Sequence, residues 1–140
     1  MYQRILVAVE NSAADRTILN HVRELATLTG AELLLVHVAD GFAARHFNDL
    51  QLRESEEMQK DRAYLDRISG ELTSLNLRVS TELAMGDPAT ELIRLAHARH
   101  ADLIAMSTHG HRGLNDLLRG TTVNRVRHEV RIPVLLLRAQ

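Results

Sequence analysis

Short apolar runs alternate along this chain with longer stretches in which apolar residues recur every three or four positions. Short apolar runs are typical of buried strands, and the three-to-four spacing is typical of helices that pack one face against a core. The pattern predicts five strands alternating with four helices. We expect strands at residues 2–9, 31–38, 77–83, 101–106 and 132–138, and helices at about 13–29, over a long charged segment that includes 58–75, at 88–99 and at about 121–130.

The same spacing predicts which helix faces are buried. One stripe on the first helix holds Ile18, Val22, Leu25 and Ala26. The buried face of the long helix is expected to hold Met58, Leu65, Ile68, Leu72 and Leu75, with its charges toward solvent. Residues 39–48 lack such spacing and are predicted to form an irregular loop.

Local signals mark the helix ends. Ser12 followed by Asp15 resembles a capping box before the first helix, and Gly30 is placed to end that helix. Asp87 is predicted to cap the third helix, with Pro88 at its first position.

Regular alternation of strand and helix indicates a parallel sheet covered by helices on both faces, and right-handed crossovers leave few strand orders. We expect one α/β domain over residues 1–140, with an open five-stranded parallel sheet in the order 3-2-1-4-5. In that order the winding reverses between strands one and four. A ligand is therefore expected beyond the carboxyl ends of those strands, at Glu10 and Ser107.

Composition narrows the class of protein. The chain has no cysteine, which excludes disulfides, a thiolate nucleophile and cysteine-based metal sites. Its first residues show no cleavable signal pattern, and no apolar run approaches membrane-spanning length, so we expect a cytoplasmic protein without membrane insertion. A formal net charge of −1 argues against general nucleic-acid binding.

Positive charge gathers near the carboxyl terminus. Residues 107–140 hold six arginines against two carboxylates, a balance that suits a local anion site. We interpret Arg127 and Arg131 as a solvated helix face. The candidate phosphate partners are Arg112, Arg119 and Arg125.

The segment after the fourth predicted strand has the composition of a phosphate-binding loop. It contains Ser107-Thr108-His109-Gly110, and Gly120-Thr121-Thr122 follows after nine residues. Glycine lets backbone N–H groups approach a ligand, and a helix beginning near Thr121 would add unpaired donors, with threonine hydroxyls to cap the helix or bind phosphate. Because the topology selects the same loop, we interpret it as a binding loop rather than an ordinary turn.

Other nucleotide-site motifs are missing. No glycine follows the first strand, as the dinucleotide fingerprint requires. The only lysine, Lys60, lies on the long helix, so neither a P-loop nor a phospho-receiver site is formed.

Two histidine-based alternatives remain weaker. A hydrolase triad built on Ser107 and His109 lacks a nucleophile elbow and an evident orienting acid. Zinc binding by the pair His109 and His111, or by His97 and His100, lacks a completing ligand. His37, inside an apolar strand, is interpreted as a core residue whose hydrogen bonds are satisfied.

The arrangement resembles the universal stress protein family, whose nucleotide-binding members carry a loop written G-x2-G-x9-G-[ST] after strand four. Here the register is Ser107-x2-Gly110-x9-Gly120-Thr121. The resemblance covers essentially the whole chain and includes the segments Ile5–Val9, Leu33–Val38, Gly86-Asp87-Pro88, Ala101–Met106 and Ile132–Leu136. It implies a Rossmann-like fold of the adenine nucleotide alpha hydrolase type.

The resemblance further implies a site for ATP, or for ADP or AMP, with Mg²⁺ as a possible companion. It places Glu10 and Val38 around adenine and ribose, Met106 at the adenosine end, and the loop backbone and hydroxyls on the phosphates. The predicted nucleotide-binding set is Ala8, Val9, Glu10, Val38, Met106, Ser107, Gly110, Gly120, Thr121, Thr122 and Val123.

Two positions depart from the family pattern. Ser107 replaces the leading glycine, which puts a side chain at the closest backbone approach and predicts weaker or reshaped binding. Glu10 replaces the usual aspartate, and its extra methylene moves the carboxylate by more than about 1 Å relative to the backbone. Thr121 in place of serine keeps the hydroxyl.

Three classes of function stay open. The first is a nucleotide-binding sensor or regulator of a stress response with at most slow ATP hydrolysis, because no general base is evident. The second is a dimeric interaction module without nucleotide, and the third is a phosphotransferase. The resemblance implies a homodimer through the edge strand Ile132–Leu137 and a regulatory protein partner of unknown identity.

Overall fold

The computed structural model describes residues 1–40, 47–108 and 115–140. In that part of the chain five strands alternate with four helices, as predicted. The elements are β1 (Arg4–Ala8), α1 (Asp15–Thr29), β2 (Glu32–Asp40), α3 (Phe47–Thr73), β3 (Val79–Gly86), α4 (Pro88–Ala98), β4 (Leu103–Thr108), α5 (Asn115–Glu129) and β5 (Val134–Arg138).

The strands form one parallel sheet in the order β3-β2-β1-β4-β5, which confirms the predicted order. The first strand lies at the centre, where Ile5 pairs in register with Leu33 of β2 and Leu103 of β4. A central parallel strand is buried on both faces, which is why β1 is a continuous apolar run. Ile5, Leu6 and Val7 are all fully buried.

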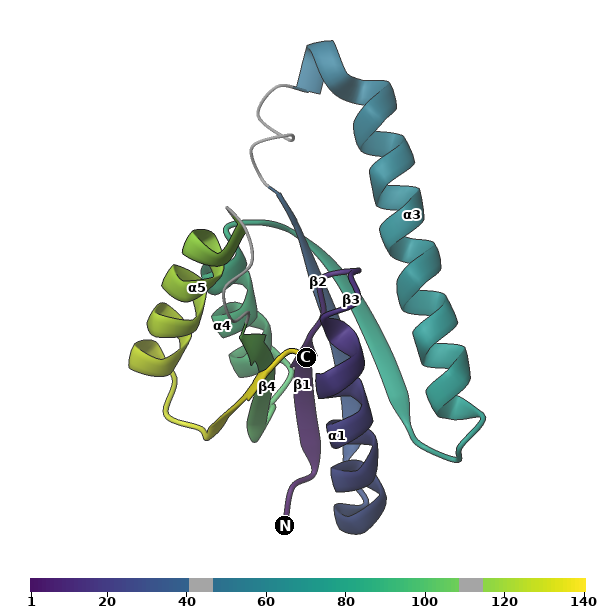
Figure 1. Ribbon diagram of the computed structural model, residues 1–140, viewed down its shortest axis with the longest axis vertical. Helices are drawn as coiled ribbons and strands as arrows, with labels where there is room; N and C mark the ends of the chain where they lie inside the picture. The colour runs from purple at the N-terminus through teal and green to yellow at the C-terminus, as the bar shows by residue number, and fades with distance from the viewer. Residues whose placement is uncertain (41–46, 109–114) are drawn as a thin grey trace.

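Helices cover both faces of the sheet, with α1 and α3 on one side and α4 and α5 on the other (Figure 1). Successive strand residues point to opposite faces, so Ile5 and Val7 join the first core and Leu6 joins the second. The helices contribute Ile18, Val22, Ala26, Leu65, Ile68 and Leu72 to the first core and Ala89, Leu92, Leu95, Ala96, Val123 and Val126 to the second.

The helix ends follow the local signals, with one variation. Gly30 adopts a left-handed φ of 75° and its N–H closes α1 onto the Ala26 carbonyl at 2.8 Å. Asp87 caps α4 by accepting the Thr90 N–H at 3.0 Å. At the start of α1 the cap position falls on Ala14, and the Asp15 side chain turns back to accept several backbone N–H groups. Only part of the predicted capping box is therefore formed.

Two expectations about helices are wrong. The last helix begins at Asn115, six residues before the predicted start, because a glycine inside a helix costs only about 1 kcal/mol relative to alanine and Gly120 does not stop it. The long helix ends at Thr73, and Leu75 lies in the turn beyond it with half its surface exposed. Of the predicted loop 39–48, residues 39–40 end β2, 47–48 begin α3, and 41–46 lie outside the described residues.

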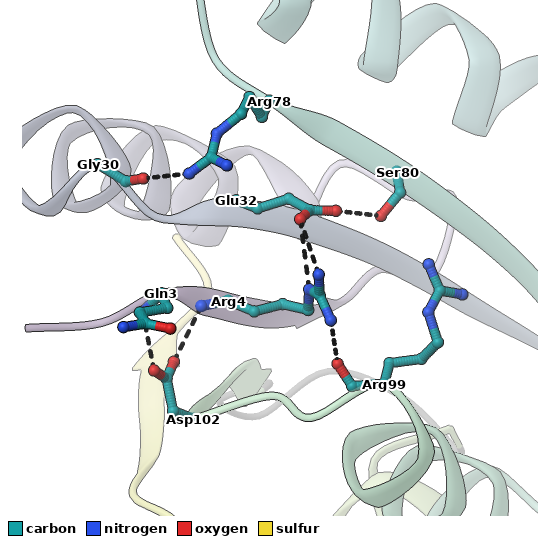
Figure 2. A network of polar contacts seen from close by, with 8 residues as sticks. All are labelled: Gln3, Arg4, Gly30, Glu32, Arg78, Ser80, Arg99 and Asp102. Carbon is teal, nitrogen blue, oxygen red and sulfur yellow. Dashed lines mark hydrogen bonds and ion pairs between the residues drawn. The ribbon is translucent and has the colours of Figure 1, made fainter.

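Charged side chains tie the amino ends of the strands together (Figure 2). The Arg4 guanidinium on β1 donates to Glu32 Oε2 of β2, 3.1 Å from Nη2, and to the backbone carbonyl of Arg99. The Ser80 hydroxyl on β3 donates to the other oxygen of Glu32 at 3.0 Å. Asp102 accepts two backbone N–H groups at the start of β1, at 2.8 and 3.1 Å. These contacts link the amino ends of four neighbouring strands, β3, β2, β1 and β4.

This network lowers the pKa of Glu32. Burial opposes its ionisation, but the hydrogen bonds from Arg4 and Ser80 outweigh that cost. A carboxylate with a lowered pKa contributes stability above its ordinary pKa, and that contribution is lost as the pH falls through the folded value.

We expect Arg4→Met to lower the free energy of unfolding by about 1–2 kcal/mol near neutral pH, because Glu32 loses its charged partner. The difference from wild type should narrow below the ordinary Glu32 pKa of 4.5, where the carboxylate takes up a proton. Urea unfolding of both proteins over a pH series measures this. A difference that stays constant down to strongly acidic pH would contradict the assignment.

Candidate functional site

A cavity of about 810 Å³ opens at the carboxyl ends of the strands. Residues from the ends of β1, β2 and β4 line it, together with residues from α3, α5 and the start of α4. From the adjacent strands β1 and β4 the chain winds in opposite directions. The cavity therefore lies at the switch point where ligands bind in open parallel sheets.

Most of the residues predicted for a binding site line this cavity. They come from four separate segments of the chain and are Ala8, Val9, Glu10, Val38, Met106, Ser107, Thr121, Thr122, Val123 and Arg125. Gly120 is an exposed residue within α5 and is not among the lining residues. Gly110 and Arg112 lie outside the described residues, as does the side chain of Arg119.

The cavity also holds residues that sequence reasoning missed, among them His37, Met58, Asp61, Met85, Asp87, Ala89 and Leu92. The sequence held a signal for two of these residues. In a parallel sheet the carboxyl end of β3 reaches the same edge as β1, so Met85 and Asp87 could have been included. For Asp61 the long helix offers no local motif, because its place at the cavity follows from how α3 packs on the sheet.

Asp15 organises the tip of β1. Its side chain is almost fully buried, and its carboxylate accepts the backbone N–H groups of Glu10 at 3.0 Å and Asn11 at 2.9 Å. The hydroxyl of Tyr64 on α3 donates to the same carboxylate at 2.5 Å. Asn11 takes a left-handed φ of 61°, which turns the chain sharply after the strand. These bonds hold the Glu10 backbone at the cavity edge.

The surroundings of Asp15 and Tyr64 shift both pKa values upward. Burial raises the pKa of Asp15, although the Tyr64 hydroxyl and the backbone N–H groups partly offset it. Burial and the hydrogen bond to Asp15 raise the pKa of Tyr64 far above its ordinary value. Tyr64 therefore stays a neutral donor at physiological pH.

A second polar chain connects α3 to the cavity wall. Asp61 accepts a hydrogen bond from the Asn11 side chain at 3.1 Å and lies 3.2 Å from Nε2 of His37. The other ring nitrogen of His37 is 3.0 Å from the Val9 carbonyl oxygen. Both ring nitrogens thus have partners, as predicted. The prediction that His37 is a core residue is wrong, because this histidine is only partly buried and borders the cavity.

Arg125 crosses from α5 to the start of α4. Its Nη1 lies 2.6 Å from Asp87 Oδ2, and its Nη2 donates to the Thr90 hydroxyl oxygen at 3.2 Å. Hydrogen bonds from the Thr90 side chain and N–H, with a further one from Arg125, lower the pKa of Asp87. The predicted phosphate partner thus lies at the cavity and is held by a carboxylate.

The predicted role of the two threonines as helix caps is wrong, because Thr121 and Thr122 follow six residues of α5. Both still line the cavity. On β4, the hydroxyl of Ser107 donates to the Ala14 carbonyl at the start of α1, at 3.4 Å. Its side chain therefore occupies space that a glycine would leave open.

Two properties of the described residues bear on other functions. None of the helices in that part of the chain is long and apolar enough to cross a membrane. Nor do its histidine, aspartate and glutamate side chains gather in a group of three or more that could hold a metal ion. Of the histidine pairs considered, His109 and His111 lie outside the described range.

Fold and cavity together define an open α/β protein with a cavity at the topological switch point of its sheet. Within that class, the chain belongs to the universal stress protein family, whose family model matches residues 1–138.

Relatives cover nearly the whole chain. The Thermus aquaticus universal stress protein in QAH/OAS sulfhydrylase 3′region is 30% identical over 99% of this chain and 100% of that protein. Universal stress protein MJ0577 of Methanocaldococcus jannaschii is 26% identical over 99% and 96% of the two chains. The solved structure of MJ0577 matches with a TM-score of 0.83 at 25% identity, over 100% of this chain and 98% of that one.

Two more distant solved structures share the fold and were determined with a nucleotide. One is a universal stress protein in complex with cAMP, with a TM-score of 0.71 and 17% identity over 99% of this chain and 98% of that one. The other is the Archaeoglobus fulgidus universal stress protein in complex with dAMP, with a TM-score of 0.66 and 21% identity over 96% and 97% of the chains.

We predict that Tyr64→Phe lowers the free energy of unfolding by about 1–2 kcal/mol, because the buried Asp15 carboxylate loses a donor. The pKa of Asp15 should rise further in the variant. The difference in unfolding free energy between variant and wild type should become smaller in acid, as Asp15 takes up a proton. Denaturant unfolding and an NMR titration of the Asp15 carboxyl carbon measure both effects.

Tyr2→Phe is the matched control, since the Tyr2 hydroxyl makes no hydrogen bond within the described residues. An equal loss of unfolding free energy in the two variants would show that the hydrogen bond to Asp15 does not stabilise the fold.

Proposed function

We propose that this universal stress protein binds an adenine nucleotide, ATP or its relatives ADP and AMP, in the cavity at the carboxyl ends of β1 and β4. Through dimerisation and partner contacts it then acts as a sensor or regulator in a stress response. The observation that carries the proposal is the cavity itself. Its volume of about 810 Å³ is within the range of small-molecule sites, and its lining includes Glu10 and Ser107, which the topology selects, and Thr121 of the loop motif.

The lining divides in a way that suits a nucleotide. Val9, Val38 and Met106 offer apolar surface for a base, and the hydroxyls of Thr121 and Thr122 offer polar contacts for phosphates. The relatives solved with cAMP and dAMP support an adenine nucleotide as the ligand class.

Arg125 and the carboxylates have defined parts in this proposal. Arg125 exchanges its contact with Asp87 for a phosphate oxygen, since guanidinium groups suit both partners. Any Mg²⁺ enters with the phosphates, and Glu10 and Asp87 at the cavity supply hard oxygen ligands toward it.

The first test measures binding by the wild-type protein. Freshly purified protein is denatured and filtered, and the filtrate is analysed for adenine nucleotides. The emptied protein is then titrated with ATP, ADP and AMP, with and without Mg²⁺, by calorimetry. We expect retained nucleotide or a dissociation constant in the micromolar range, with a rise in unfolding free energy of about 2.7 kcal/mol at a hundredfold excess over Kd. No heat and no stabilisation would overturn nucleotide binding.

A pair of glycine variants locates the binding site. Gly120 and Gly70 are both exposed residues within helices, and an added Cβ meets no atom within 4 Å at either position. Replacing glycine by valine should therefore change helix propensity equally at the two positions. We predict that Gly120→Val weakens ATP binding at least about tenfold, or ~1.4 kcal/mol, because it puts a branched side chain directly before Thr121, which lines the cavity. We expect Gly70→Val to leave the affinity unchanged. Equal affinities for both variants would remove Gly120 from the site.

The proposed homodimer uses the free edge of β5. Ile104 donates its N–H to the Pro133 carbonyl, and Ala139 donates its N–H to Thr108. Odd-numbered residues of the strand therefore direct their backbone groups to β4, and even-numbered residues such as Leu136 direct theirs to the open edge. An open edge of this kind favours pairing with a second copy.

We expect wild-type protein to scatter light with twice the chain mass, and Leu136→Pro to give a monomer, because proline removes an outward N–H while sparing those that reach β4. Circular dichroism controls for folding of the variant. A wild-type monomer at micromolar concentration, or a folded Leu136→Pro dimer, would contradict pairing through β5.

One observation favours the second candidate, a dimeric interaction module without nucleotide. Arg125 is already held by Asp87, and the threonines do not lie at a helix N-terminus, so the phosphate cradle differs from the one expected. The nucleotide titrations decide between the candidates, because the interaction module predicts dimerisation without nucleotide binding.

A further inference from the structure

A second cavity, of about 620 Å³, lies between α1 and α3 and shares no lining residue with the first. We propose that this α1–α3 groove is a docking site for an acidic, amphipathic helical segment of a protein partner. The proposal gives a place and a chemistry to the partner contacts of the proposed function, and it does not depend on nucleotide binding. Figure 1 shows the two helices on the same face of the sheet.

Three arginines border the groove. Arg16 and Arg23 lie two turns apart on one face of α1, and Arg67 lies on α3. Within the described part of the chain, none of the three makes an ion pair. Glu71 is the single carboxylate among the lining residues. The groove therefore has an excess of guanidinium groups, which suit carboxylates through paired hydrogen bonds.

One of these arginines is held in place. The guanidinium carbon of Arg67 lies 5.4 Å from the centre of the Tyr64 ring, and the Tyr64 hydroxyl is bound by the buried Asp15 carboxylate. A charged group that is ordered before binding loses less conformational entropy when a ligand arrives. This supports a binding role over a solvated helix face.

The groove also has an apolar floor. Leu19, Ile68 and Leu72 line it, with Ile68 and Leu72 nearly buried, and half-exposed Leu75 lies in the turn beyond α3. A ligand that matches both features needs a row of carboxylates beside an apolar stripe. An amphipathic helix that lays its apolar face in a groove between two helices has that form. A nucleic acid supplies the charge but not the apolar stripe.

The test uses a fluorescein-labelled synthetic helical peptide of about 15 residues, with leucines on one face and glutamates beside them. A scrambled peptide of the same composition is the first control. Fluorescence anisotropy at low salt should give a dissociation constant at least tenfold lower for the amphipathic peptide. Amide NMR shifts should concentrate on Asn20, Arg23, Arg67 and Glu71.

Two pairs of variants test the groove itself. Arg16→Glu with Arg23→Glu should weaken peptide binding at least tenfold, whereas Arg62→Glu with Arg127→Glu, an equal charge change on exposed residues outside the groove, should change it less than twofold. Leu75→Ser should weaken binding several-fold, and Leu28→Ser, at another exposed leucine outside the groove, should not.

Several outcomes overturn the proposal. These are equal affinity for both peptides, no binding at hundreds of micromolar, equal losses in the two charge-reversal pairs, and tighter binding of a single-stranded oligonucleotide than of the peptide. The groove variants should leave ATP titrations unchanged. A failure here is thereby distinguishable from a failure of nucleotide binding.

Discussion

The buried carboxylate of Asp15 is the interaction on which both cavities depend. It gathers backbone N–H groups from the tip of β1 and the hydroxyl of Tyr64 from α3, so one side chain joins the central strand, the first helix and the long helix. A buried charge is tolerated only when donors surround it. Because those donors come from separate elements, satisfying this one group fixes where the chain turns after β1 and how α3 lies over the sheet.

The two cavities share this wall from opposite sides. Glu10 and Asp61 face the cavity at the strand ends, whereas Asn11 and Tyr64 border the α1–α3 groove. Asp15 accepts hydrogen bonds from Glu10, Asn11 and Tyr64, and Asp61 accepts one from Asn11, so the four residues belong to one network. The two cavities are therefore neighbours across a single layer of polar contacts.

The two ends of the sheet differ in structure. At the amino ends, Arg4 donates hydrogen bonds from its guanidinium to Glu32 and from its backbone N–H to Asp102, and these bonds hold the strands in register. At the carboxyl ends, apolar strand tips, threonine hydroxyls and the contact between Arg125 and Asp87 surround open space. Such a division is general for parallel sheets, because loops at the carboxyl ends converge where the winding reverses.

Apolar periodicity was enough to predict the order of elements and the parallel sheet, and the handedness of the crossovers narrowed the strand order. Continuous apolar strands such as Ile5–Val9 need helices on both faces, and handedness leaves few ways to connect them. The same reasoning placed Glu10 and Ser107 at one edge. Local signals were reliable where the chemistry is local, as at Gly30 and Asp87.

Packing between distant segments decided the rest. Asp15 looked like half of a capping box, yet its role depends on Tyr64, forty-nine residues away. Gly120 looked like a loop residue, but α5 continues through it as Val123 and Val126 bury against the sheet. Asp61 and the α1–α3 groove have no motif, since their positions follow from how a long helix lies across the sheet. The repeat of apolar residues determines which elements form, whereas contacts between elements determine where their polar side chains meet.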